Sequence, residues 1–178
     1  VRCKLCATGR YQQASGRTSC TACDAGQYQS GTGARACTTC GFGQFQHDEG
    51  KRSCQECNAN CRAGTVHMFC AGDSPGMCTA CPKGQHKTIA GAHGCADCAT
   101  GKYTDIMGLT QCLACAQGTY QPAAGASSCD ACDYHCAEGE QHTGCGGGSA
   151  GACVACAAGQ SKSGAGWHGC TGCAAGRF

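Results

Sequence analysis

Ten cysteine pairs of the form CxxC are the residues of this chain whose type and spacing could do chemistry. They begin at Cys3, Cys20, Cys37, Cys54, Cys78, Cys95, Cys112, Cys129, Cys153 and Cys170. Thiolates at this spacing bind zinc, and an exposed CxxC thiolate can exchange disulfides. Oxidised pairs would instead cross-link the chain. The residues around the pairs discriminate among these three roles.

The composition favours cross-linking. The chain has 178 residues, of which 24 are cysteine and only 12 are Leu, Ile, Val or Phe. Ordering the backbone costs about 1–2 kcal/mol per residue, and so few apolar side chains cannot offset that cost by burial. Covalent cross-links or metal must therefore supply the difference. Cysteine at this density is typical of disulfide scaffolds made in an oxidising compartment, so we expect an extracellular or cell-surface location.

The pairs recur at fixed intervals of 17 residues, interrupted twice by an interval of 24 residues that contains two extra cysteines. The extra cysteines are Cys61 with Cys70 and Cys136 with Cys145. We expect short repeats over 1–53, a long four-cysteine repeat over 54–77, short repeats over 78–128, a second long repeat over 129–152, and short repeats, incomplete at the end, over 153–178. Such periods are typical of a stack in which each repeat meets its neighbours.

The short repeat reads CxxCxxGxΦxxxxGxxxC, in which Φ is usually aromatic. The aromatic residues at Φ are Tyr11, Tyr28, Phe45, Tyr103, Tyr120 and Phe178, and the departures are His86 and Ser161, 75 residues apart. Glycine at two fixed places indicates backbone turns. We therefore expect small disulfide-rich repeats, forming an elongated solenoid-like rod of irregular short β-hairpins with little or no helix. The Φ side chain is expected to lie over a disulfide or the adjoining turn.

Metal and redox roles fit the pattern less well. Zinc would take two cysteine pairs per ion, so the intervals within a site and between sites should differ and alternate along the chain. Instead, all of the 17-residue intervals have the same glycine and aromatic pattern. Four cysteines would also be left over. A thioredoxin-like thiolate needs a strand and a helix, and no helical periodicity is present. We predict no metal site and no cofactor, and keep zinc as a third hypothesis that stoichiometric zinc with free thiols would establish.

Catalysis is not expected either. His67, His86, His93 and His135 could be placed beside cysteines as catalytic dyads, but exposed turn residues explain them more simply. The run HDEGKR over 47–52 is likewise expected to be a solvated hairpin tip rather than a cation site. We predict no catalytic residues and no enzymatic activity.

The charge pattern excludes several partners. Lys and Arg number 13 against 11 acidic residues, without a basic run, so no nucleic acid is expected. No stretch approaches 18 apolar residues, and Val1 opens onto a cysteine pair without a charged leader, so we expect no membrane insertion in this segment. Neither Asn58 nor Asn60, the only asparagines, starts an N-glycosylation acceptor. O-linked glycan on exposed hydroxyls remains open.

The motif CxxCxxGx[YF], followed by a glycine and another CxxC, resembles the ephrin-receptor-like cysteine-rich repeat over essentially the whole chain. The short repeat is also similar to the one-disulfide module of tumour necrosis factor receptor domains, and the long repeat to their crossed two-disulfide module. Tandem arrays of this kind occur in protist surface proteins and flagellar-hair proteins. The resemblance implies no catalytic residues and a rigid extracellular rod.

The resemblance also implies a disulfide pairing. The short repeats would pair Cys6 with Cys20, Cys23 with Cys37, Cys40 with Cys54, Cys81 with Cys95, Cys98 with Cys112, Cys115 with Cys129 and Cys156 with Cys170. The long repeats would pair crosswise, Cys57 with Cys70, Cys61 with Cys78, Cys132 with Cys145 and Cys136 with Cys153. Cys3 and Cys173 would be left for residues beyond the ends. An interlocked ladder, such as Cys3 with Cys23 and Cys20 with Cys40, would also use each thiol once and stays open.

The regular spacing suits a structural fibre, in which equivalent repeats present equivalent contacts. We therefore expect an extracellular structural protein that self-associates, forming or decorating a filament or surface coat. The alternative is a receptor-like or secreted ectodomain that binds a protein ligand.

Overall fold

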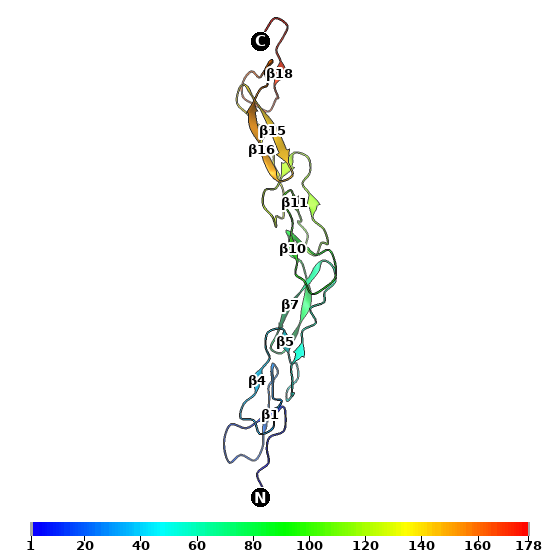
Figure 1. Ribbon diagram of the computed structural model, residues 1–178, viewed down its shortest axis with the longest axis vertical. Coiled ribbons are helices and arrows are strands. Elements are labelled where there is room, and N and C mark those ends of the chain that lie inside the picture. The colour runs from blue at the N-terminus through cyan, green and yellow to red at the C-terminus, as the bar shows by residue number, and fades with distance from the viewer. Residues whose placement is uncertain (1, 178) are drawn as a thin grey trace. The chain divides into compact units, whose positions relative to one another are not determined.

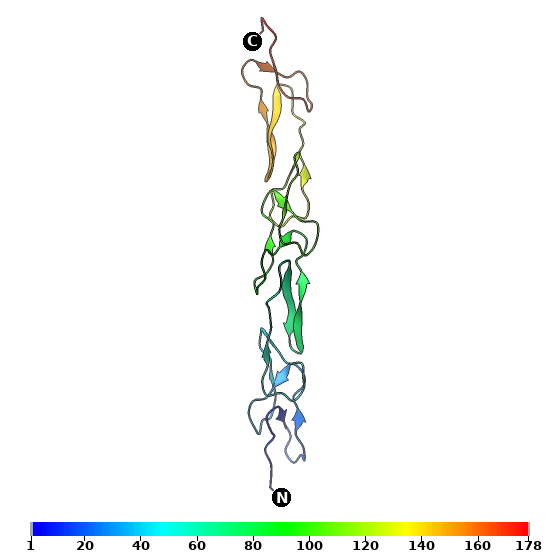
Figure 2. The same ribbon diagram turned by 90° about the vertical axis from the view of Figure 1, so that its right-hand side faces the viewer.

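The computed structural model describes residues 2–177, and all of their regular structure is β-strand (Figure 1). Strands that follow each other in sequence pair into nine two-stranded sheets. Seven sheets use strands of two residues: β1 Arg10–Tyr11 with β2 Thr21–Ala22, β3 Gln27–Tyr28 with β4 Thr38–Thr39, β5 Gln44–Phe45 with β6 Gln55–Glu56, β9 Gln85–His86 with β10 Ala96–Asp97, β11 Lys102–Tyr103 with β12 Leu113–Ala114, β13 Thr119–Tyr120 with β14 Asp130–Ala131, and β17 Gln160–Ser161 with β18 Thr171–Gly172. Two sheets are longer hairpins, β7 Thr65–Ala71 with β8 Ser74–Ala80 and β15 Glu140–Gly146 with β16 Ser149–Ala155 (Figure 2).

The chain divides into two compact parts. One contains the residues up to Thr79 together with Ala90–Gly94, and the other contains Ala80–Ile89 and the residues from Cys95 onward. Each part holds one of the long hairpins and several of the short ones.

Each hairpin belongs to one disulfide-closed module, which we define as running from the second cysteine of a pair to the residue before the second cysteine of the next pair. The modules cover residues 6–22, 23–39, 40–56, 57–80, 81–97, 98–114, 115–131, 132–155 and 156–172. The modules 57–80 and 132–155 are the long ones. The repeat boundaries stated from sequence remain predictions.

The first glycine of a module makes the turn that starts its hairpin. In module 6–22 the Arg10 amide donates to the Ala7 carbonyl at 3.1 Å, and Gly9 has a φ of 77°. This is the third position of a four-residue turn, where type II geometry requires positive φ and therefore favours glycine. The turn directs the chain into β1, where Tyr11 lies opposite Thr21.

Main-chain hydrogen bonds join each module to the next. Between modules 6–22 and 23–39 the amide donors and carbonyl acceptors are Gly9 to Gln29 at 2.7 Å, Gln12 to Ala34 at 3.0 Å and Gly33 to Cys6 at 2.8 Å. The same three bonds join modules 81–97 and 98–114, as Gly84 to Thr104 at 2.9 Å, Lys87 to Leu109 at 3.2 Å and Gly108 to Cys81 at 2.8 Å. The junctions are thus built from backbone groups and repeat with nearly the same geometry in both compact parts.

Modules also contact the module that lies two positions further along the chain. A Cβ atom built on Gly9 would clash with the carbonyl oxygen of Gly50, which lies two modules away. A Cβ on Gly84 would clash with the carbonyl oxygen of Gly125 in the same way. Glycine is therefore required at this position twice over, by the turn and by the close approach of another backbone.

Small disulfide-rich repeats with short antiparallel hairpins are confirmed as the fold class, and the residues from 2 to 177 contain no helix. The two hairpins with seven-residue strands are longer than the irregular short hairpins predicted for every repeat. The solenoid-like rod remains a prediction.

Candidate functional site

The structure brings the cysteines of residues 2–177 together into eleven disulfides, with Cα–Cα distances from 5.6 to 6.1 Å. The short modules contain Cys6–Cys20, Cys23–Cys37, Cys40–Cys54, Cys81–Cys95, Cys98–Cys112, Cys115–Cys129 and Cys156–Cys170. The long modules contain the crossed pairs Cys57–Cys70 with Cys61–Cys78, and Cys132–Cys145 with Cys136–Cys153. Cys3 and Cys173 are free. No ladder pair is formed, since Cys23 is bonded to Cys37.

Cystine sulfur replaces an aliphatic core. The buried hydrophobic residues in the described chain are all cysteines: Cys6, Cys23, Cys61, Cys81, Cys98 and Cys136. Leu5, Ile89 and Trp167, which would normally fill an interior, are 65–79% exposed. Stability must therefore come mainly from cross-links, which limit the freedom of the unfolded chain, and from the main-chain bonds between modules.

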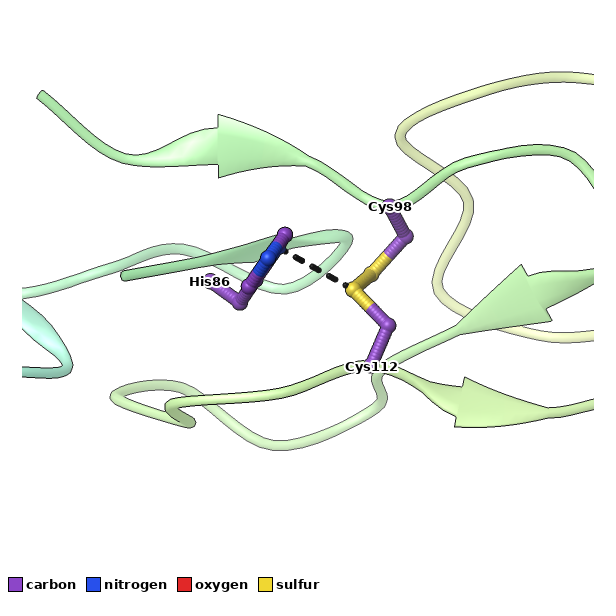
Figure 3. A group of neighbouring side chains, drawn as sticks. All are labelled: His86, Cys98 and Cys112. Atoms are coloured by element: carbon purple, nitrogen blue, oxygen red, sulfur yellow. Dashed lines mark hydrogen bonds between the residues drawn. A yellow bond between two sulfur atoms is a disulfide. The ribbon is translucent and has the colours of Figure 1, made fainter. Parts of the chain in front are cut away.

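The Φ position is half-buried wherever an aromatic residue within 2–177 occupies it, at Tyr11, Tyr28, Phe45, Tyr103 and Tyr120. Phe178, also assigned to Φ, lies outside the described residues. His86 occupies Φ in module 81–97 and contacts the disulfide of the next module, Cys98–Cys112 (Figure 3). For the aromatic residues, contact with a disulfide remains a prediction.

His86 is positioned by the hairpin β9–β10. It lies opposite Ala96 in the register, and its Nδ1 atom is 3.1 Å from the Ala96 carbonyl oxygen. Because a carbonyl oxygen only accepts, we assign a proton to Nδ1. The same Nδ1 atom is 3.3 Å from the Sγ atom of Cys112, and the edge of the ring points at the sulfur (Figure 3).

A cavity of about 410 Å³ opens beside this contact. Its lining consists of His86, Thr88, Asp97, Ala99, Lys102, Thr110, Gln111 and Cys112. Residues with hydroxyl, amide and charged groups of both signs thus line this cavity together with Cys112. The Asp97 carboxylate accepts a hydrogen bond from the Gln85 side chain at 2.8 Å.

The donor atoms of His86, Cys98 and Cys112 all lie within 4.8 Å of one another, close enough to hold one metal ion. Zinc binds cysteine as the thiolate, however, and both sulfur atoms are committed to the disulfide. In the oxidised protein this cluster therefore offers one imidazole and no thiolate.

The other histidines that the sequence singled out are not members of this cluster. The Nε2 atom of His67 is 3.1 Å from the Pro75 carbonyl oxygen, across the hairpin β7–β8. His93 and His135 are exposed. In the run 47–52, Lys51 and Asp48 form an exposed ion pair at 3.2 Å.

A glutamine that follows Φ is a recurring structural residue that the sequence pattern had not identified. In module 6–22, the Gln12 Nε2 donates to the Ser19 carbonyl at 2.8 Å, and its Oε1 accepts from the Ala14 amide at 3.0 Å. Gln29, Gln46 and Gln121 make the equivalent pairs of bonds. Each glutamine thereby holds the loop of its own module closed. The signal was available in the sequence, because glutamine follows Φ four times.

Two buried lysines were also missed. Lys87 and Lys162 take the place of this glutamine, 75 residues apart, and are only 2% and 4% exposed. The Lys162 ammonium donates to the Cys136 carbonyl at 3.0 Å and to the Gly166 carbonyl at 2.8 Å. It thus ties module 156–172 to the preceding long module. Lysine is usually exposed, so sequence alone gave no reason to place it inside.

Comparison with known families identifies part of the chain. The family model described as tyrosine-protein kinase ephrin type A/B receptor-like matches residues 1–36 and 101–145, a little less than half of the sequence. A search of curated proteins found no match. Repeats of this family together with abundant disulfides indicate an extracellular domain, and they are not typical of enzymes. Residues 2–177 contain no helix long and apolar enough to span a membrane.

Proposed function

We propose that this chain, which carries ephrin-receptor-like cysteine-rich repeats at residues 1–36 and 101–145, is a structural component of an extracellular filament or surface coat. Chains would self-associate through equivalent surfaces presented at regular intervals. The protein would work through its cross-linked backbone, without a catalytic site or cofactor. O-linked glycan on exposed hydroxyls is compatible with this role.

The single observation that carries the proposal is the repetition of the junctions. The three main-chain bonds between modules 6–22 and 23–39 recur between modules 81–97 and 98–114 with donor–acceptor distances that differ by at most 0.2 Å. Because backbone groups form them, side chains on the surface can vary without disturbing the stack. Constant junctions give surface groups the constant spacing that a filament requires.

Electron microscopy of the purified, oxidised protein tests the proposal. We expect filaments or sheets whose axial period is a multiple of one module. If the protein stays as separate single molecules at every protein concentration tested, the proposal of a structural fibre is contradicted. The matched control is the protein after reduction and alkylation, which should lose the assemblies together with the fold.

A second candidate function, binding of a protein ligand by an ectodomain, is favoured by one surface. On the hairpin β7–β8, Met68, Phe69 and Met77 are 45%, 71% and 62% exposed. Exposed apolar groups of this size on one hairpin are typical of protein contacts. Retention of a defined partner by the immobilised protein, abolished by the double variant M68T/M77A, would support this function over the filament.

A further inference from the structure

The disulfide Cys98–Cys112 combines two properties that matter for its reactivity. An imidazole lies beside it, since His86 stands where most short modules have an aromatic residue. A cavity of about 410 Å³ is also lined by one of its cysteines, Cys112. We propose that Cys98–Cys112 is a thiol–disulfide exchange site, at which an external thiolate attacks the Sγ atom of Cys112.

Access selects the sulfur that is attacked. Cys98 is 0% exposed, whereas Cys112 is half-buried and lines the cavity. Exchange requires the nucleophile to approach a sulfur atom directly, so the buried sulfur is protected and the one at the cavity is not. Lys102 and Asp97, also in the lining, carry opposite charges, so the lining presents no net negative charge to repel an incoming thiolate.

The imidazole acts on the charge that develops during the reaction. The attacking sulfur bonds to the Cys112 Sγ, the Cys98–Cys112 bond breaks, and its electron pair leaves with the Cys98 Sγ. The products are a mixed disulfide at Cys112 and a thiolate at Cys98. Negative charge is shared among the sulfurs in the transition state, and His86 lies within 4.8 Å of both protein sulfurs. The Nδ1 proton of His86 interacts favourably with negative charge on these sulfurs, so the Cys98 thiolate leaves more readily.

A tyrosine or phenylalanine at Φ cannot do this. Neither side chain has a ring N–H group that could face the sulfurs, so a disulfide beside Tyr or Phe lacks this stabilisation. Ser161, the other departure, is exposed and lies in the module that ends before Cys173, which is free. The substrate class that follows is a thiol small enough for the cavity, or a cysteine on an exposed loop of another protein.

The experiment uses the oxidised full chain and reduced glutathione as the probe. Cys3 and Cys173 are first blocked with N-ethylmaleimide. After brief exposure to limiting glutathione, new thiols are alkylated with a second label and the digest is analysed by mass spectrometry. We expect glutathione on Cys112 and the second label on Cys98, appearing at least about tenfold faster than at any other disulfide. Earlier opening of another disulfide, or the adduct on Cys98, would overturn the proposal.

Two variants separate the role of the imidazole from a structural one. His86→Tyr installs the residue of four other modules, and we expect it to slow exchange at Cys112 about tenfold while hydrogen exchange in module 98–114 stays unchanged. A loss of reactivity that follows altered hydrogen exchange, or no loss, would contradict the proposal. Should His86→Tyr fail to fold, His86→Phe, which installs the residue of module 40–56, decides: slower exchange at Cys112 in the folded variant supports the imidazole's role, and unchanged reactivity refutes it.

Discussion

The hairpins β7–β8 and β15–β16 occupy equivalent places in the two compact parts but present different surfaces. Their crossed disulfides have the same sequence separations, 13 and 17 residues. Where β7–β8 carries exposed Met68, Phe69 and Met77, the positions 75 residues later carry Thr143, Gly144 and Ala152. Cysteines set the shape of both hairpins, and the remaining positions are free to differ. The exposed side chains of one hairpin can therefore be changed without changing the fold.

The largest expected effect removes the feature that the two hairpins share. The double variants C61S/C78S and C136S/C153S each open a crossed disulfide, and Cys61 and Cys136 are both 1% exposed. We expect each variant to lose about 3–5 kcal/mol of the free energy of unfolding, measured by denaturant titration. Because the closed loops have the same length, the two losses should agree within about 1 kcal/mol. Losses that differ more would mean that the hairpins are not equivalent.

A smaller effect comes from the glycines at the centre of each hairpin. A Cβ on Gly76 would lie 2.6 Å from the Met68 carbonyl oxygen, and one on Gly151 would lie 2.6 Å from the Thr143 carbonyl oxygen. We expect G76A and G151A to cost about 1–3 kcal/mol each, as judged by thermal unfolding. G172A, in the second strand of a short hairpin with no atom within 4 Å of the added Cβ, is the matched control.

Exchanging one residue between the hairpins should change stability in opposite directions. Phe69 has a φ of 64°, and the equivalent Gly144 has a φ of 78°. A left-handed backbone costs a side-chain-bearing residue about 1–2 kcal/mol relative to glycine. We expect G144F to destabilise the protein by about 1–2 kcal/mol and F69G to stabilise it by about 0.5–1 kcal/mol, by denaturant titration. Stabilisation by G144F would contradict the equivalence of the two backbones.

The smallest effect on stability is expected from the surface residues that distinguish the hairpins. Met68 and Met77 are exposed, so M68T/M77A should change the free energy of unfolding by less than about 0.5 kcal/mol. The same variant should lower the binding of a fluorescent hydrophobic probe. Variants T143M/A152M should raise probe binding in return. Equal probe binding by all three proteins would show that these side chains do not form an accessible patch.

The sequence predicted the fold best where cysteine and glycine determine the local structure. Their spacing predicted short hairpins without helix, and the Cys98–Cys112 loop illustrates how the fixed interval places a closure in each short module. The approach of Gly9 to Gly50 could not be read in the same way, because it depends on how modules rotate as they stack. The burial of Lys162 also depends on tertiary context, since its partners are backbone carbonyls that no pattern displays.

The site at His86 could be predicted only in part from the sequence. Its departure from an aromatic residue could be seen in the sequence, and so could its phase in the 75-residue period. What could not be seen was that His86 meets the disulfide of the next module, because CxxC spacing alone does not tell which module a side chain faces.

The position of the disulfides decides how a pulling force travels along the chain. In a short module the bond between Cys6 and Cys20 bypasses 14 residue steps, so tension crosses sulfur and then only the three steps from Cys20 to Cys23 before it meets the next cystine. Three residues extend by no more than about 11 Å even when taut. The segments enclosed by the disulfides bear no tension, and the short segments between disulfides bear all of it. The protein would therefore extend little under force while its disulfides are intact.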